Sequence, residues 1–542
     1  MSTQTLPGRA ATRPTSTPRG ADLAAFVAGA LAALVAIAVA EMMAALVSGA
    51  PSLVIAIADL IVALQPPGAK QLMVELFGDA DKLVVDVMIV SAAALIAGLV
   101  GVLGRRSFGR AVFAFGIAGA VGLIAALRQP LTDPVLAVIT TVVAMGAAIV
   151  ALRLLLAACA PAWGRTRTGT AAGDPAMDPA ARATAAMPDW DRRGFLIRGG
   201  AVAVASVAVG ALGRTLLQTR PAAAVAQPLP EVAGPAVEVP PGAELAVAGI
   251  TPIVVPTDQF YRIDTAFVVP RVDTSTWTLT IKGMVDREVV LTYDQLAAMP
   301  VFEQYVTIAC VSNEVGGKLV GNALWRGVDL RSVLEMAGVQ AGATQLVGRS
   351  VDDFTAGFPT AWAMDPARRP MIALGMNGEP LPAQHGYPAR LIIPGLYGYV
   401  SATKWIKEIE LTTLEGFDGY WVPLGWAKEA PILTQSRIDV PKHNASVAAG
   451  PVAVAGVAWA PDRGISAVEV RVDDGPWQQA ELSNPLATAA WVQWLLAWDA
   501  PAGRHTIRVR ATDGEGVVQT EERTRPAPDG ARGHHSIEVA VA

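Results

Sequence analysis

The apolar residues of this chain follow two different patterns. In the first 220 residues, alanine, valine and leucine form long uninterrupted runs, whereas after residue 250 apolar and polar positions alternate over short stretches. A helix needs ~20 apolar residues to cross a bilayer. The pattern therefore predicts transmembrane helices at about residues 23–47, 83–103, 111–127 and 135–158, with a weaker fifth one at 199–217.

A shorter apolar run covers residues 53–64 and ends at Pro66-Pro67. It is too short to cross a bilayer, which favours a re-entrant or interfacial segment. Glu41 and Asp86 lie inside apolar stretches, where a charge is costly and often functional. A role in helix packing or at the membrane interface is the alternative.

The charges between the apolar runs predict the orientation of the chain. With the N-terminus inside, twelve arginines fall on the cytoplasmic side, against three basic residues outside. This bias matches the positive-inside rule and places everything after residue 217 outside the cytoplasm, at the plasma membrane. The twelve are Arg9, Arg13, Arg19, Arg105, Arg106, Arg110, Arg165, Arg167, Arg182, Arg192, Arg193 and Arg198, and the three are Lys70, Lys82 and Arg128.

The fifth apolar run follows Asp191-Arg192-Arg193-Gly194-Phe195-Leu196, which resembles a twin-arginine export signal in an internal position. The alternative is that the paired arginines anchor a helix at the cytoplasmic face. Residues 224–226 (Ala-Val-Ala) have the form of a cleavage site, and the sequence leaves open whether cleavage occurs.

Composition excludes some functions. The net charge of −5 and the lack of a basic stripe with interleaved aromatic residues argue against a nucleic-acid partner. The two cysteines, Cys159 and Cys310, do not form a disulfide framework. All five histidines fall after residue 384, so we expect no haem in the helices. The helices then serve as an anchor, or as a docking site for an electron partner such as a quinone, a cytochrome or a redox subunit.

The composition and the hydrophobic pattern divide the rest of the chain into regions. We expect a membrane region at 1–218 and a Pro- and Ala-rich linker at 219–252, followed by a mixed α+β domain at 253–440. Residues 277–282 alternate like a strand. Thr292-Tyr-Asp-Gln295 has the spacing of a capping box, and residues 331–338 predict a short helix closed by glycine.

Cys310 follows a β-rich run, 304–309, and precedes the turn-rich stretch Val311-Ser-Asn313-Glu-Val-Gly316-Gly317. A cysteine at a strand-to-loop junction can present a thiolate, which is a soft ligand for a metal such as molybdenum. A buried apolar filler is the alternative.

Residues 257–440 resemble the sulfite oxidase family of molybdenum enzymes, in its membrane-anchored bacterial branch. The resemblance rests on motifs in the family's order. They are Asp258-Gln-Phe-Tyr-Arg262, the Cys-x-x-Asn motif at Cys310-Val-Ser-Asn313, Met376-Asn-Gly-Glu-Pro-Leu-Pro382, His385-Gly-Tyr-Pro-Ala-Arg390, Pro394-Gly395 and Lys404-Trp405.

The resemblance implies an oxidoreductase with a molybdenum–molybdopterin cofactor that performs two-electron oxygen-atom transfer on a small oxo substrate. Cys310 would be the metal ligand, with Asn313 and Arg262 beside it in the catalytic site. The implied cofactor-binding residues are Tyr261, Arg262, His385, Arg390, Ala402, Thr403 and Lys404.

The sequence departs from sulfite oxidases at the substrate. Glu314-Val315 stand where that family has arginines, and Phe354 stands where it has a tyrosine. Losing a cation and gaining a carboxylate weakens anion binding if the pocket is desolvated. A sulfur or nitrogen oxide then fits at least as well as sulfite. A non-catalytic cofactor-binding or sensory membrane protein on the same fold is the alternative, as is a structural receptor.

The last hundred residues contain short alternating strands separated by turns such as Asp473-Asp-Gly475, which predict an all-β, immunoglobulin-like sandwich at 441–542. It resembles the dimerisation domain of the same family, which implies a homodimer. We expect Trp459, Trp477, Trp491, Trp494 and Trp498 to be core or interface residues, and His534-His535 to be a solvated pair.

Overall fold

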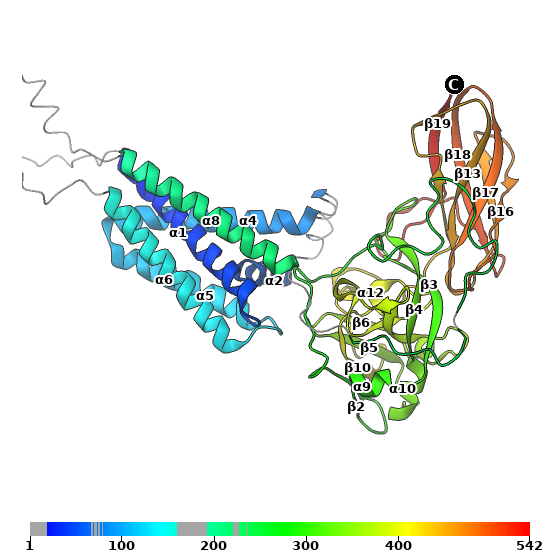
Figure 1. The fold of residues 1–542 in the computed structure, drawn as a ribbon, viewed down its shortest axis with the longest axis horizontal. Helices are drawn as coiled ribbons and strands as arrows, with labels where there is room; N and C mark the ends of the chain where they lie inside the picture. Colours follow the sequence, from blue (N-terminus) through cyan, green and yellow to red (C-terminus); the bar gives the residue numbers. More distant parts are fainter. Residues whose placement is uncertain are drawn as a thin grey trace, which may run out of the picture. The chain divides into compact units, whose positions relative to one another are not determined.

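The computed structural model describes residues 19–66, 69, 73, 76–77, 80–159, 192–219, 227–235 and 237–542 (Figure 1). The chain divides into two compact units, Met1–Arg220 and Pro221–Ala542. Some sequence predictions concern parts outside the described residues: the possible cleavage site at 224–226, the basic residues Arg9, Arg13, Lys70, Arg165, Arg167 and Arg182, and the side chains of Arg19, Cys159, Arg192 and Arg193.

The first unit is helical. Within the described residues its helices are α1 (Arg19–Leu46), α2 (Leu53–Leu64), α4 (Asp81–Arg106), α5 (Phe108–Leu127), α6 (Pro134–Cys159) and α8 (Arg192–Thr219). Five of them are long and apolar enough to cross a membrane, and they coincide with the five expected spans to within a few residues. The short run at 53–64 forms α2, capped by the Ser52 hydroxyl, which accepts from the Ile55 amide.

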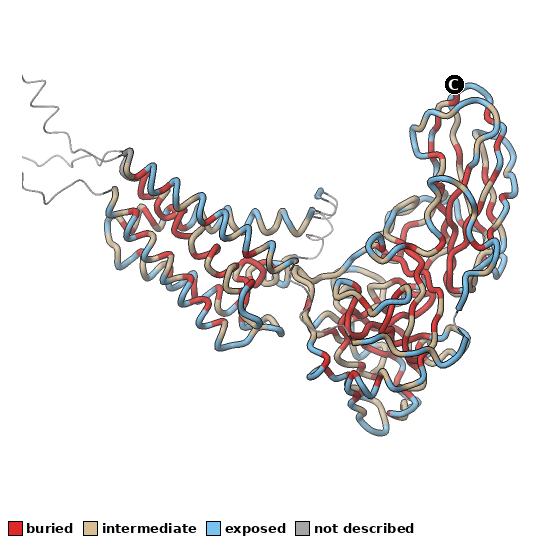
Figure 2. Tube along the Cα trace, in the orientation of Figure 1, coloured by how far each residue is buried: buried red, intermediate tan, exposed pale blue. Residues whose placement is uncertain are grey.

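Helix α1 packs against α4, α6 and α8 and is the most enclosed of the five. In an 18-residue apolar stretch of α1, 56% of the residues are buried, against 11–33% in the corresponding stretches of the other four helices (Figure 2). Small residues allow this packing: a Cβ at Gly29 would lie 2.0 Å from the carbonyl oxygen of Ala97, so the backbones of α1 and α4 touch. Close approach through glycine is typical of helices that associate in lipid.

Three charged side chains in the described part of this unit, those of Glu41, Asp86 and Arg214, form a largely buried cluster. Arg214 of α8 forms an ion pair with Asp86 of α4 and lies 3.5 Å from the carboxylate of Glu41 on α1. The Ser52 hydroxyl donates to the same Glu41 carboxylate. Only 5% of the Glu41 side chain is exposed. The two acidic residues within apolar stretches therefore bind three helices together around one arginine.

The second unit begins with an α+β domain built on two sheets, ordered β2-β1-β10-β5-β6 and β3-β4-β7-β8, with β9 paired to β7. Strands β1 and β10 are parallel, and the other pairs are antiparallel. The elements are β1 (Thr278–Gly283), β2 (Val289–Thr292), α9 (Tyr293–Ala297), β3 (Val301–Ala309), β4 (Val320–Asp329), α10 (Leu330–Ala337), β5 (Gln345–Ser350), β6 (Thr355–Pro359), α11 (Thr360–Met364), β7 (Met371–Met376), β8 (Glu379–Pro380), η2 (Ala383–His385), β9 (Arg390–Ile392), α12 (Gly398–Ser401), β10 (Ile406–Thr412) and η3 (Val422–Leu424).

Local signals in the sequence produced the expected elements here. Thr292 and Gln295 form a reciprocal capping box at the start of α9. Helix α10 ends at Gly338, whose φ of +72° is a left-handed conformation that favours glycine. Strand β3 ends at Ala309, so Cys310 lies at a strand-to-loop junction as predicted.

The C-terminal module consists of two sheets, β11-β13-β17-β16 and β12-β19-β18-β14-β15, that enclose one core (Figure 2). Trp494 and Trp498 belong to that core, whereas Trp459 and Trp491 pack into the core of the α+β domain. The strands are β11 (Gln435–Val440), β12 (Ala445–Val447), β13 (Gly450–Trp459), β14 (Ile465–Val472), β15 (Gln478–Gln479), β16 (Glu481–Leu482), β17 (Val492–Ala500), β18 (Gly503–Asp513) and β19 (His535–Val541).

The prediction of a solvated His534-His535 pair is wrong. Both residues are half-buried. His535 Nδ1 accepts the Ile438 amide at 2.9 Å, and His534 Nε2 lies 3.0 Å from the carbonyl oxygen of Gln519. The proximity of β11 and β19, which the sequence does not reveal, brings the His535 ring to the Ile438 amide.

The Arg214 cluster yields a prediction for the first unit. Arg214→Leu leaves Glu41 and Asp86 without their cation, so the free energy of unfolding should fall by about 2 kcal/mol. The measurement is the thermal unfolding midpoint in detergent, followed by circular dichroism. Arg110→Leu, at an exposed position, is the control. Equal midpoints for the two variants would show that the cluster does not stabilise the unit.

Candidate functional site

Cys310 opens the loop that joins β3 to β4. The loop closes on itself: the Cys310 amide donates to Leu319 O at 2.9 Å, and the Leu319 amide donates to the Asn313 side-chain oxygen at 2.8 Å. Asn313 therefore shapes the loop that carries Cys310. The thiol is buried, and burial raises its pKa, whereas hydrogen bonds from Ser312 lower it. Without a bound group the sulfur is held as a thiol.

Tyr261 interacts electrostatically with both Cys310 and Arg390. Burial raises the pKa of Tyr261, the Cys310 sulfur raises it further, and the Arg390 guanidinium lowers it. The Tyr261 phenol thus lies within electrostatic range of both groups. Cys310 also raises the pKa of Tyr397, behind burial as the larger cause. The thiol therefore interacts with two phenols, those of Tyr261 and Tyr397, and the first of these also interacts with the Arg390 guanidinium.

Arg390 and His385 come from β9 and η2. Arg390 is buried, with its guanidinium 5.0 Å from the centre of the Trp325 ring. Its Nη1 donates to His385 O at 3.1 Å, while its Nε has no hydrogen-bond partner within the described residues. Burial lowers the pKa of Arg390 to about 10 and that of His385 to about 4. His385 is therefore neutral at pH 7 and close to an incompletely paired cation.

Lys404 and Arg262 share one counter-ion, Asp264. Lys404 Nζ lies 3.1 Å from the Asp264 carboxylate, and Arg262 Nε lies 2.9 Å from the same oxygen. Burial lowers the pKa of Lys404 to about 8, and Asp264 opposes this shift. Asp264 was not among the residues that the sequence indicated, because a single acidic residue two positions after Arg262 carries no motif.

Thr403 and Ala402 precede Lys404 at the end of α12. The Ala402 amide donates to Gly398 O, and Thr403 O accepts from the Leu391 amide, which fixes this segment against β9. The Thr403 hydroxyl is buried and has no hydrogen-bond partner among the described residues. Gly386 lets Lys404 approach, because a Cβ there would lie 3.3 Å from Lys404 Cα.

The charges of this region fit a phosphate monoester. Three cations, Arg262, Arg390 and Lys404, minus the Asp264 carboxylate leave two positive charges. Asp352 interacts with Asp264, and burial raises the pKa of its carboxyl. A phosphate monoester carries close to two negative charges at neutral pH. The orphaned Arg390 Nε and Thr403 hydroxyl are the donors that a phosphate oxygen would satisfy.

The positions at which the sequence departs from sulfite oxidases, Glu314, Val315 and Phe354, carry no buried charge. Glu314 is exposed, so solvent screens the carboxylate that we expected to oppose an anion. Val315 is half-buried and supplies no cation. Phe354 is half-buried with its ring 5.8 Å from that of Tyr420. The predicted weakening of anion binding therefore depends on the missing arginine and not on the Glu314 carboxylate.

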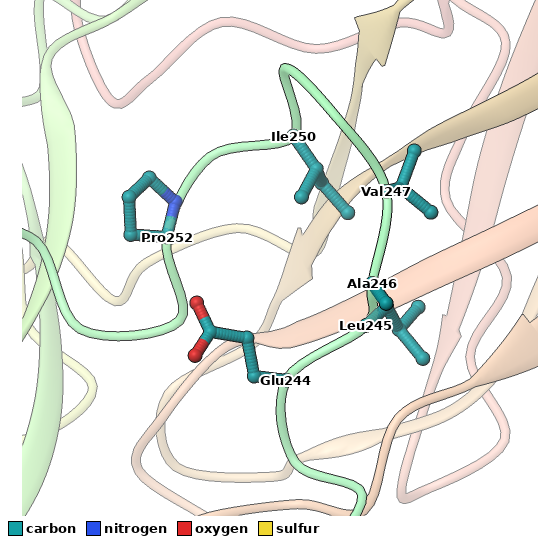
Figure 3. Close-up of a pocket in the computed structure, with 6 residues that line it drawn as sticks. All are labelled: Glu244, Leu245, Ala246, Val247, Ile250 and Pro252. Atoms are coloured by element: carbon teal, nitrogen blue, oxygen red, sulfur yellow. The ribbon is translucent and has the colours of Figure 1, made fainter.

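A surface hollow of about 500 Å³ lies elsewhere in this unit, lined by Glu244, Leu245, Ala246, Val247, Ile250 and Pro252 (Figure 3). Its walls are backbone and mostly apolar side chains with a single carboxylate. None of the lining residues is among those grouped around Cys310 and Arg390. Across the described residues, no three His, Cys, Asp or Glu side chains gather to hold a metal, so Cys310 is a single donor.

Comparison with known proteins identifies the same region. Residues 266–421 match the model of the oxidoreductase molybdopterin binding domain. Mitochondrial sulfite oxidase of Homo sapiens is 30% identical over 302 residues, which cover 47% of this chain and 55% of that protein. Nitrate reductase [NADH] 1 of Oryza sativa subsp. japonica is 36% identical over 179 residues, covering 28% of this chain and 19% of that one.

The chain spans about half the length of the sulfite oxidases that it matches. Among solved structures, the sulfane dehydrogenase SoxCD from Paracoccus pantotrophus is similar with a TM-score of 0.47 and 22% identity, covering 55% of this chain and 85% of that one.

The incomplete pairing of Arg390 leads to a prediction for the cofactor-free protein. Arg390→Met removes a desolvated charge, so the free energy of unfolding should rise by about 1 kcal/mol. The matched control is Arg326→Met, which removes the partner of buried Glu303 and should lower the free energy of unfolding by about 3 kcal/mol. Urea denaturation followed by tryptophan fluorescence measures both. Destabilisation by Arg390→Met would mean that the guanidinium is already fully compensated.

His385 predicts a pH dependence. Its pKa is about 4 in the folded protein and 6.5 unperturbed, so the unfolded chain binds more protons between these values. Stability from this group is present above pH 6.5 and is lost as pH falls toward 4. Over that interval the cofactor-free wild type should lose about 2 kcal/mol more than His385→Gln. Parallel urea-denaturation curves across this pH range would contradict the assignment.

Proposed function

We propose that this chain, a member of the sulfite oxidase family of molybdopterin-dependent oxidoreductases, uses Cys310 to bind molybdenum and performs two-electron oxygen-atom transfer outside the cytoplasm. The chain is a molybdopterin oxidoreductase with a molybdenum–pterin cofactor. The observation that carries the proposal is the position of Cys310 directly after β3. There, its sulfur and the Arg390 guanidinium both affect the pKa of the Tyr261 phenol.

The residues divide into two functions. Arg390, Lys404 and Arg262, with His385 and the Thr403 hydroxyl, would hold the cofactor's phosphate, because they combine net positive charge with unsatisfied donors. Cys310 would provide the protein's thiolate to the metal, and binding would displace its proton. When bound, the cofactor supplies a metal that exchanges an oxygen atom and two electrons with the substrate. Asn313 holds the loop, and Tyr261 excludes water beside the sulfur.

The substrate is a small sulfur or nitrogen oxo compound. Val315 leaves the site without the cation that a dianion such as sulfite would need, which favours a neutral oxide. Relatives named sulfite oxidase and nitrate reductase act on oxo compounds of these two elements. Sulfite itself remains the reference substrate against which the others are compared.

The helical unit anchors the protein in the plasma membrane. The five long apolar helices support a membrane anchor, and the arginine bias supports an N-terminus in the cytoplasm with the second unit outside. Export of a folded, cofactor-loaded domain gives a reason for the paired arginines at the start of α8. Electrons would pass to or from a quinone, a cytochrome or a redox subunit, and the immunoglobulin-like C-terminal module would support a homodimer.

The alternative is a non-catalytic cofactor-binding or sensory membrane protein on the same fold. The two proposals share the cofactor and differ in turnover. Such a protein needs the phosphate-binding residues but gains nothing from a substrate-accessible metal.

Metal content and turnover test the proposal together. Purified wild type should hold about one molybdenum per chain, and Cys310→Ser should lose most of it. Cys159→Ser, the other cysteine, is the control and should keep it. A redox titration by electron paramagnetic resonance should show a Mo(V) signal, followed by turnover of at least one sulfur or nitrogen oxide. A loaded wild type that turns over none of these compounds, sulfite included, would favour the sensory alternative.

A further inference from the structure

The C-terminal module contacts the Cys310 loop at its tip and also contacts β3, the strand that leads into the loop. Within the loop, hydrogen bonds close the base, where Cys310 and Leu319 meet, and the Gly317 amide donates to Glu314 O at 2.8 Å. The carbonyl of Gly317 points outward. Its partner is Arg437 of β11, whose Nη1 donates to it at 2.9 Å.

Arg437 is itself fixed. Its Nε donates to Asp439 at 2.7 Å and its Nη2 donates to the Thr251 hydroxyl at 2.8 Å. The Arg437 and Asp439 side chains are only 9% and 5% exposed. Each of the three guanidinium nitrogens of Arg437 donates a hydrogen bond, and a buried arginine fixed in this way holds its acceptor more rigidly than a flexible cation would. The tip of the Cys310 loop is therefore tied to β11.

His535 of β19 supports the neighbouring position, Gly316. The amide of Ile438, next to Arg437, donates to His535 Nδ1 at 2.9 Å, which orients the ring. A Cβ on Gly316 would lie 2.2 Å from His535 Cδ2, so the loop backbone rests directly on the imidazole edge. Gly316 has a φ of +79°, a conformation that glycine adopts without strain.

The strand that leads to Cys310 is tied to the same module. Three residues before Cys310, the Thr307 amide donates to Ala489 O at 2.9 Å, and its hydroxyl accepts from the Trp491 amide at 2.8 Å. Trp491 also donates from Nε1 to Ile253 O at 2.8 Å. Contacts on the strand and at the loop tip thus bracket the cysteine.

We propose that Arg437 and His535 are positioning residues for Cys310: the C-terminal module sets where the thiol sits and how far its loop opens. The consequence for metal binding rests on the proposed function, whereas the position of the thiol can be tested without a metal. The module then contributes to the chemistry of each chain, in addition to any part in dimerisation.

Thiol reactivity in the metal-free protein tests this directly. In the full chain with Cys159→Ser, Cys310 is the remaining cysteine, so its alkylation rate reports opening of the loop. Arg437→Gln and His535→Ala should each raise that rate about tenfold by removing a support of the loop. Arg437→Lys, which keeps a donor, should recover part of the protection.

Arg463→Gln is the matched control. Arg463 is a half-buried, ion-paired arginine of the same module, bound to Asp513 and Asp462, and its hydrogen bonds do not reach the Cys310 loop. It should leave the alkylation rate within about twofold of the parent. If Arg463→Gln accelerates alkylation as much as Arg437→Gln, general loosening explains the effect and the proposal fails. Unchanged rates in both Arg437→Gln and His535→Ala also overturn it.

A second readout uses the loaded protein. Displacing the sulfur should shift the g-values of the Mo(V) signal in Arg437→Gln and leave them unchanged in Arg463→Gln. A wild type that binds no molybdenum would defeat the proposed function, while the alkylation comparison would still decide whether the module positions Cys310.

Discussion

Two buried cations, Arg390 and Lys404, with one carboxylate between them and Arg262, are the feature on which the functional half of this protein depends. Desolvation lowers the pKa of both groups, and the single carboxylate of Asp264 compensates only part of their charge. A folded chain tolerates such a cost when a ligand offsets it. The surrounding structure, from Trp325 under the guanidinium to the Gly386 turn beside Lys404, keeps these cations together rather than letting them separate toward solvent.

Much of this arrangement could be predicted from the sequence because it is encoded locally. The apolar runs gave the five long helices, the Thr292 and Gln295 pair gave the start of α9, and a β-rich run followed by a turn placed Cys310 at the end of β3. The motif around His385 and Arg390 gave a neutral imidazole and a buried guanidinium, and the guanidinium interacts with Tyr261. Short-range signals of this kind can be interpreted without knowing which strands become neighbours.

The parts that could not be predicted depend on contacts between distant segments. Asp264 matters because Lys404, 140 positions away, approaches it, and no pattern in the sequence announces that pairing. His535 looked like half of a solvated pair, yet the association of β19 with β11 buries its ring against Gly316. Glu41 and Asp86 looked like isolated charges until α8 supplied Arg214. In each case the partner lies on an element whose position is set by tertiary packing.

The central claim is that the Cys310 sulfur binds the metal. X-ray absorption at the molybdenum edge measures it most directly, by comparing the loaded wild type with whatever metal Cys310→Ser retains after reconstitution. The account predicts one fewer sulfur neighbour at thiolate distance in the variant, with the pterin sulfurs unchanged. Identical sulfur coordination in the two proteins would contradict it.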